Sequence, residues 1–178
     1  MPKALHSLSI LTLILSVSTA WAWDPDPNDK MQLKVQAAIL DIVAKDPGME
    51  DWFKNATGYA VFPSVGKGGI GIGGAHGKGL VIAGDKVIGT TSLSQVTLGL
   101  QLGGQAYAEF IFFRDQTALD DFKRGNYEMG AQASAVAATA GAAADASYNS
   151  GVAVFTNTTG GLMFEASVGG QKFKFTPN

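Results

Sequence analysis

The sequence contains no cysteine, and its two histidines are His6 and His76. Without cysteine the chain cannot form disulfide bonds, so its fold must rest on packing alone. The same absence excludes a lipoprotein, whose lipid is attached to a cysteine at the cleavage site. His6 lies in an N-terminal segment that we expect to be removed, and one remaining histidine is too few for a histidine–carboxylate metal cluster. We therefore expect no metal and no cofactor.

Charged residues are also scarce, at 16% of the chain, and the formal net charge is −2 at pH 7. Proteins that bind nucleic acid through its phosphates need a clearly basic surface. We therefore expect no nucleic-acid partner. A weakly acidic protein can still bind an anionic membrane through a local basic patch, so the composition leaves a membrane partner open.

The N-terminal segment has the order of features that is typical of a secretory signal peptide. Lys3 supplies a positive charge, residues 8–17 are mainly apolar, and Ala20 and Ala22 form a small-residue cleavage site. The apolar run of about ten residues is shorter than a transmembrane helix, which needs roughly 20. We therefore expect a signal peptide over residues 1–22, a single mature domain over residues 23–178, and a periplasmic or secreted protein.

Glycine is abundant, with 23 residues spread over segments that otherwise have the pattern of strands. Glycine weakens a strand unless a bend, a bulge or a close backbone approach requires it. Bulky apolar residues alternate with these glycines throughout. We therefore predict an α+β, mostly β fold, with a curved, glycine-rich antiparallel sheet or barrel-like core, an N-terminal helix and one mid-chain helix.

The N-terminal helix is predicted to begin after Asn28 or Asp29, either of which can cap it, and to run to about Lys45. Two apolar faces follow from the helical period, and they comprise Met31, Val35, Ala38, Ile39 and Ile42 on one side and Leu33, Ala37, Leu40 and Ala44 on the other. A narrow charged strip between them contains Lys30, Lys34, Asp41 and Lys45. One interpretation is a membrane-surface helix whose lysines reach the head groups. The other, which we favour, is a helix wedged into its own domain.

Further segments are predicted from periodicity and turn residues. Helices are expected over residues 49–55 and, capped by Asp115, over residues 115–124. The expected strands, separated by turns that include residues 75–78, cover residues 58–63, 67–74, 79–83, 86–91, 95–103 and 105–113. Residues 127–147 fit either helix or strand. The chain closes with a predicted three-stranded meander over residues 151–157, 162–168 and 171–175.

No residue pattern meets the geometric requirements of an active site. His76 lies in an expected loop, and no serine occupies a Gly-x-Ser-x-Gly elbow. Residues 66–71 match G-x-G-x-x-G, but a strand follows them, whereas dinucleotide binding needs a helix N-terminus there. The Gly77-Lys78 pair lacks the serine or threonine that follows it in a nucleotide-binding P-loop. We therefore predict that the protein is not an enzyme.

Several spaced blocks resemble the SYLF domain family, in the order in which that family carries them. The blocks are Gly58-Tyr59-Ala60-Val61-Phe62-Pro63, Gly66-Lys67-Gly68-Gly69, Gly77-Lys78-Gly79, Gly130-Ala131-Gln132-Ala133-Ser134 and residues 160–170. The resemblance covers about residues 30–175. It implies a compact, mostly β domain that binds lipid, and in eukaryotic relatives it implies phosphoinositide binding with the help of an N-terminal amphipathic helix. It also favours strand over helix for residues 127–137.

Transferred to this chain, the resemblance points to four lysines as lipid contacts. They are Lys67 and Lys78 at the expected glycine-rich turns, and Lys30 and Lys34 on the first helix. Glycines let a head group approach the backbone amides while lysines neutralise its phosphate; alternatively, Lys67 and Lys78 only keep the turns soluble. Eukaryotic members are cytosolic, whereas this chain is expected to be exported. Because phosphoinositides are scarce in bacteria, we expect a bacterial phospholipid or membrane surface as the partner.

The leading hypothesis is an exported, non-catalytic module that contacts anionic phospholipid head groups through a basic, glycine-rich region. One alternative is a small outer-membrane β-barrel, which the alternating strands and the aromatic ending Phe173 and Phe175 allow. The helical segments and the short strands oppose it. A second alternative is a periplasmic hydrolase that uses His76.

Overall fold

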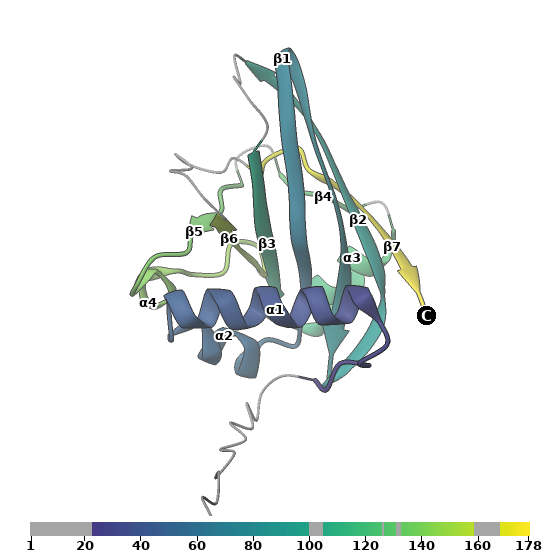
Figure 1. The fold of residues 1–178 in the computed structure, drawn as a ribbon, viewed down its shortest axis with the longest axis vertical. Coiled ribbons are helices and arrows are strands. Elements are labelled where there is room, and N and C mark those ends of the chain that lie inside the picture. The colour runs from purple at the N-terminus through teal and green to yellow at the C-terminus, as the bar shows by residue number, and fades with distance from the viewer. Residues whose placement is uncertain (1–22, 100–104, 126, 131–132, 159–167) are drawn as a thin grey trace, which may run out of the picture.

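The computed structural model describes residues 23–99, 105–125, 127–130, 133–158 and 168–178. These residues form a curled sheet with helices against both of its faces, as Figure 1 shows. The helices are α1 (Lys30–Lys45), α2 (Met49–Asn55), α3 (Gln116–Lys123) and α4 (Ala142–Asp145). The strands are β1 (Gly58–Ala83), β2 (Lys86–Gly99), β3 (Gln105–Phe113), β4 (Tyr127–Glu128), β5 (Val136–Ala137), β6 (Val152–Thr158) and β7 (Lys172–Pro177). The predicted fold class, mostly β with an N-terminal and a mid-chain helix, is confirmed.

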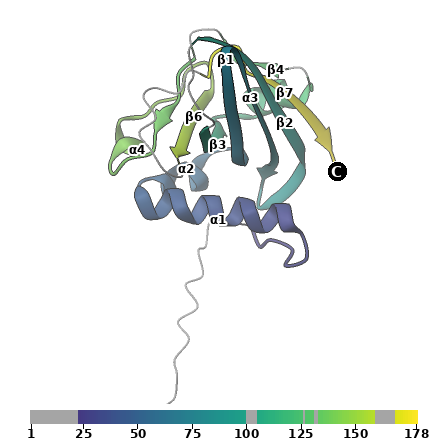
Figure 2. The same cartoon turned by 45° about the horizontal axis from the view of Figure 1, so that its top comes forward.

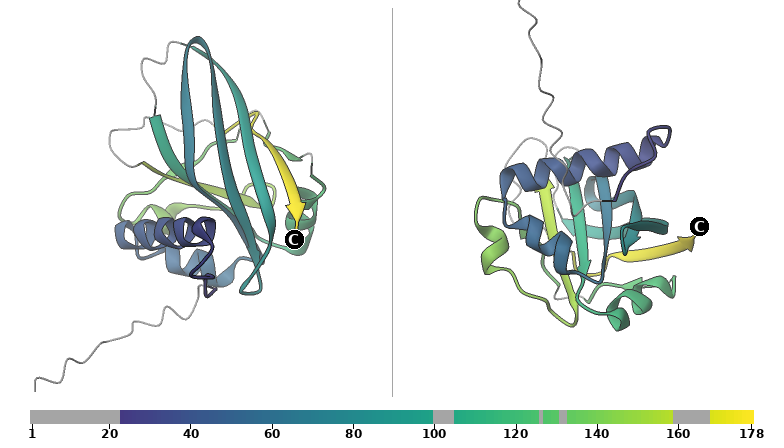
Figure 3. Two further views of the ribbon diagram at one scale, coloured as in Figure 1. Left: turned by 45° about the vertical axis from the view of Figure 1, so that its right-hand side comes forward. Right: turned by 90° about the horizontal axis from the view of Figure 1, so that it is seen from below.

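The strands lie in the order β4-β7-β2-β1-β3-β6-β5. Neighbours are antiparallel except for β5 and β6, which are parallel. β1 turns back on itself, so that residues 58–67 pair with β3 while residues 71–83 pair with β2. The left view of Figure 3 shows this bend at the far end of β1. β1 therefore contributes two arms to the middle of the sheet.

The two arms of β1 lie so close together that only glycine fits between them. A Cβ atom added to Gly79 would lie 2.3 Å from the carbonyl oxygen of Val61, and one added to Gly77 would lie 2.9 Å from Cγ2 of Val65. The predicted turn over residues 75–78 is wrong, because these residues are paired with β2. Their glycines permit the close approach of two strands, and the bend lies earlier in the chain, where the pairing changes from β3 to β2.

Local capping determines where the main helices begin, and the predictions for them are confirmed. The side chain of Asp29 accepts hydrogen bonds from the backbone N–H groups of Met31 and Gln32 at the start of α1. Asp115 accepts one from Ala118 at the start of α3. Both contacts satisfy N–H groups that have no partner within the helix. α2 covers the predicted residues 49–55.

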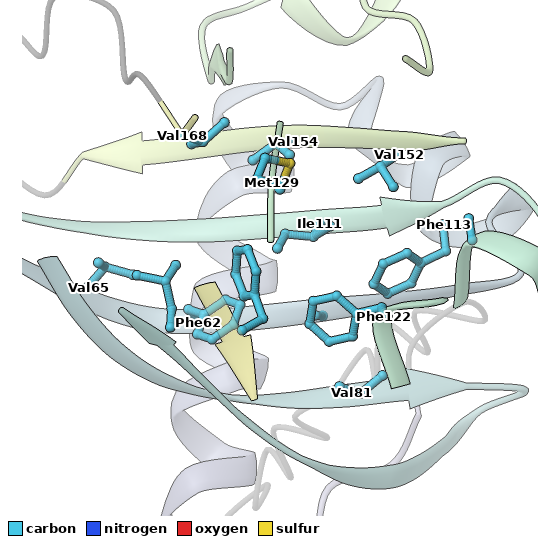
Figure 4. Close-up of a cluster of buried hydrophobic side chains, with 14 of the residues drawn as sticks. Phe62, Val65, Val81, Ile111, Phe113, Phe122, Met129, Val152, Val154 and Val168 are labelled. Atoms are coloured by element: carbon cyan, nitrogen blue, oxygen red, sulfur yellow. The ribbon is translucent and has the colours of Figure 1, made fainter. Parts of the chain in front are cut away.

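Each face of the sheet carries its own apolar core. On the α1 face, the buried side of α1 packs with α2 on the sheet; the residues concerned include Val35, Ile39, Ile42, Phe53, Val61, Leu80, Ile82, Phe110 and Phe112. On the α3 face, the rings of Phe62, Phe113 and Phe122 belong to one buried cluster, which Figure 4 shows. β3 is buried on both faces, as its place between β1 and β6 in the sheet requires.

The C-terminal third is less regular than the rest. Residues 127–147 contain both kinds of structure, since β4 and β5 have two residues each and α4 has four. The outer strands of the predicted closing meander are present as β6 and β7. Its middle strand, residues 162–168, lies outside the described residues except for Val168, which is buried in the core of the α3 face.

Candidate functional site

α1 has an apolar strip on the side that faces away from the sheet. The side chains of Leu33 and Leu40 are 40% and 48% exposed. Ala37 and Ala44, which share their side of the helix, are exposed as well. The prediction of a wedged helix is therefore wrong for this second apolar face, because nothing in the described part of the chain covers it. Figure 2 shows α1 lying across one end of the sheet with its outer side open.

The charged strip of α1 divides into a paired part and an unpaired part. Lys45 forms an ion pair with Asp41 at 3.4 Å and also donates a hydrogen bond to Asn157. Lys30 and Lys34 are exposed, and no carboxylate of the described residues lies within ion-pair distance of either. The apolar strip is thus bordered near its N-terminal end by two ammonium groups without a counter-charge.

Lys78 lies on the α1 face of the sheet. It is paired across β1 and β2 with Ser92, and Ser92 is paired across β2 and β7 with Lys174. Residues that are directly opposite each other in neighbouring strands share one face, so the three side chains form a row. The row borders a groove of about 420 Å³ that also contacts Asp29 and Met31 at the start of α1. Lys78, Lys30 and Lys34 therefore lie toward one side of the molecule.

Lys67 lies on the opposite face. It lies two residues after Val65, whose side chain is in the core of the α3 face. Because side chains alternate between faces along a strand, Lys67 is on the same face as Val65. It is partly buried and is paired with Gln105 of β3. The four lysines predicted as one site thus divide between two faces. The sequence reasoning placed Lys67 and Lys78 at turns, whereas they lie in the two arms of β1.

Lys174 was missed by the sequence reasoning, although a signal for it was present. The alternation Lys172-Phe173-Lys174-Phe175 places lysines on one face of β7 and phenylalanines on the other. Phe173 is 2% exposed and packs in the core of the α3 face. Only the strand order showed that β7 lies beside β2, and hence that Lys174 and Lys78 belong to one row.

Comparison with known proteins agrees with the blocks noted in the sequence. Residues 94–177 match the family described as Ysc84, the Las17-binding protein actin regulator, whose domain is the SYLF domain. This match identifies a SYLF domain in residues 94–177. Beta cell expansion factor A of Aeromonas veronii is 28% identical to this chain over 138 residues, which are 76% of this chain and 52% of that protein. The chain thus spans about half the length of this curated relative.

The SYLF family is a family of lipid-binding domains and is not a known class of enzyme.

In the structure His76 is exposed on β1, opposite Ser94 of β2. Among the described residues, no acidic side chain forms an ion pair with His76 and no group of three metal-ligating side chains comes together. None of the helices in this part of the chain is both long and apolar enough to cross a bilayer.

The SYLF domain also contains a buried carboxyl group that the sequence reasoning did not single out. Glu109 interrupts the apolar pattern of β3 and is fully buried. It accepts hydrogen bonds from the side-chain amide of Gln171, at 2.9 Å, and from the hydroxyl of Tyr107. Burial raises the pKa of Glu109 to about 7 because the charged form loses its hydration, and the two hydrogen bonds oppose this effect.

Proposed function

We propose that this SYLF domain is an exported module that binds the surface of anionic phospholipid membranes through α1, and that it acts without catalysis. The observation that carries the proposal is the exposed apolar strip of α1. The opposite side of the same helix is fixed to the sheet by Val35, Ile39 and Ile42. α1 therefore has a free apolar surface on a rigid support.

The physical argument combines apolar burial with charge. Leu33 and Leu40 can enter the boundary between head groups and acyl chains, as in other interfacial helices. Lys30 and Lys34 lie beside them, and each basic residue near an anionic surface contributes about 1 kcal/mol to binding. Their long apolar stems allow the ammonium groups to reach the phosphates while the helix lies flat.

The proposal of export rests on the N-terminal segment and on the position of Trp23. Trp23 is 5% exposed and belongs to the core of the α1 face. Its indole N–H donates a hydrogen bond of 3.3 Å to the side chain of Gln32. Cleavage after Ala22 would thus leave a chain whose first residue is already part of the fold. The partner we propose is a bacterial phospholipid.

The test is co-sedimentation of the mature protein with vesicles of phosphatidylglycerol and phosphatidylcholine. We expect binding that increases with the phosphatidylglycerol fraction and decreases with salt. Lys30→Gln with Lys34→Gln should weaken it. The matched control is Lys123→Gln with Arg124→Gln, which removes two charges at the C-terminal end of α3, on the other face of the sheet. Equal binding of the two double variants would contradict the role of α1, and no binding of the unmodified protein to any vesicle would contradict the function.

A further inference from the structure

We propose that the α1 face of the sheet holds the phosphate group of an anionic phospholipid between Lys78 and Lys174, above Ser92. This site is separate from the apolar strip of α1 and adds a head-group contact to the surface described above. The inference rests on the proposed membrane binding and specifies which chemical group the sheet recognises.

The register of the three strands brings the two lysines together. Lys78 pairs with Ser92 and Ser92 pairs with Lys174, so β2 lies between the two lysines. Neighbouring strands lie about 4.8 Å apart, which places the two lysine backbones about 10 Å apart on one face. Two flexible lysine side chains that begin at this separation can both reach a single group above the serine between them.

The surrounding rows supply hydrogen-bond donors. The next row toward α1 consists of Leu80, Thr90 and Thr176, again paired across the same strands. The hydroxyl groups of Ser92, Thr90 and Thr176 can each donate a hydrogen bond to a phosphate oxygen. Ammonium and hydroxyl donors around one concave surface are the groups that a phosphodiester requires.

Charge on this surface is unbalanced in favour of an anion. Among the described residues, no carboxylate lies within ion-pair distance of Lys78 or Lys174. Asp29 is the acidic residue that borders the same groove. Its two oxygens accept hydrogen bonds from Met31, Gln32 and the Gln32 side chain at the start of α1. Its carboxylate is therefore oriented toward the helix.

The neighbouring row on the side away from α1 contains His76, Ser94 and Lys172, and its lysine has a carboxylate partner. Lys172 forms an ion pair with Glu128 at 3.7 Å. Within the described ranges, Lys78 and Lys174 thus have no carboxylate partner, in contrast to Lys172. Their position beside the start of α1 places a bound phosphate next to the helix that is proposed to meet the membrane.

The site is tested with two double variants of equal charge change. Lys78→Gln with Lys174→Gln removes the proposed site, and Lys123→Gln with Arg124→Gln removes two charges elsewhere. All four side chains lie at least partly in solvent, so we expect both variants to fold, which circular dichroism verifies. On vesicles of phosphatidylglycerol and phosphatidylcholine, we expect the first variant to lose about tenfold or more in affinity and the second to remain within about threefold of the unmodified protein.

A second readout uses the unmodified protein and does not depend on variant folding. Lysine acetylation followed by mass spectrometry should show that phosphatidylglycerol vesicles protect Lys78 and Lys174 but leave Lys67 reactive. Inorganic phosphate is the comparison, and equal protection by it without vesicles would overturn the assignment to a lipid. If the protein binds vesicles while both double variants bind alike and Lys78 stays reactive, this site is wrong and α1 binding stands. If the unmodified protein binds no vesicle, both proposals fail.

Discussion

The side-chain amide of Gln171 donates a hydrogen bond of 2.9 Å to the carboxylate of Glu109, and both residues are 0% exposed. This contact joins β3 to the segment that leads into β7. A buried carboxyl group is most stable in its neutral form, so the burial of Glu109 makes the stability of the domain depend on pH. Because neither residue is at the proposed membrane surface, this dependence can be measured separately from binding.

We expect the free energy of unfolding to decrease as pH rises from 5 to 8. The pKa of Glu109 is about 7 in the folded protein, whereas the ordinary value for glutamate, which applies to the unfolded chain, is 4.5. Between these two values the folded state therefore binds more protons than the unfolded state does. The stabilisation is complete below about pH 4.5 and is lost as pH rises through 7, a change of about 3 kcal/mol at most. Glu109→Gln should flatten this slope and raise stability at pH 8. Urea unfolding at the two pH values measures it, and an unchanged slope in the variant would exclude Glu109 as its cause.

Gly79→Ala should destabilise the domain by about 2–3 kcal/mol, as expected for overpacking. The added methyl group would collide with the backbone of Val61 and with the ring of Phe62. Backbone atoms cannot move aside as a flexible side chain can, so the two arms of β1 must separate. Thermal unfolding measures the loss.

Gly66→Ala is the matched control for the close approach in β1. It lies in the same strand, and a Cβ atom there would meet nothing within 4 Å. We expect its stability to be unchanged or raised by up to about 1 kcal/mol, because alanine lowers the entropy of the unfolded chain. Similar losses in both glycine variants would show that the distance between the arms is not the cause.

Asp46→Ala should loosen the contact between the end of α1 and the α4 segment. Asp46 is 2% exposed, and its carboxylate accepts hydrogen bonds from the backbone N–H groups of Ala143, at 2.7 Å, and of Gly48, at 3.1 Å. Removing it leaves a buried donor without an acceptor, which costs about 1–3 kcal/mol. Amide hydrogen exchange at Ala143 should accelerate. The exposed Asp24→Ala variant should exchange there like the unmodified protein.

Local chemistry made the helices predictable from the sequence. Asp29 and Asp115 mark the starts of α1 and α3 because capping depends on residues two or three positions apart. The apolar period of α1 also identified both of its faces. It did not show which of them is covered, since Leu40 and Ile39 are equally apolar in sequence and only the sheet distinguishes them.

The pairing of strands that are far apart in the sequence could not be predicted from local residue patterns. Gly77 was interpreted as a turn residue because glycine is frequent in turns, and Gly79 as the start of a new strand. In the structure both glycines allow one arm of β1 to approach the other. The faces of Lys67 and Lys78 depend on where the bend lies and on the irregular register between Phe62 and Val65. A shift of one residue moves a side chain to the other face, so the site was only partly predictable.

Ile39→Ala and Leu40→Ala separate the two roles of α1 with substitutions at neighbouring positions. Ile39 is 1% exposed within the core of the α1 face, whereas Leu40 is 48% exposed. Truncating the buried side chain should cost about 2–5 kcal/mol, while truncating the exposed one should change stability by less than about 0.5 kcal/mol. On anionic vesicles, at temperatures where both variants are folded, we expect Leu40→Ala to lose more affinity than Ile39→Ala, because in the proposed binding mode only Leu40 faces the bilayer. If Leu40→Ala binds vesicles as well as the unmodified protein does, the outer strip of α1 makes no contact with the membrane.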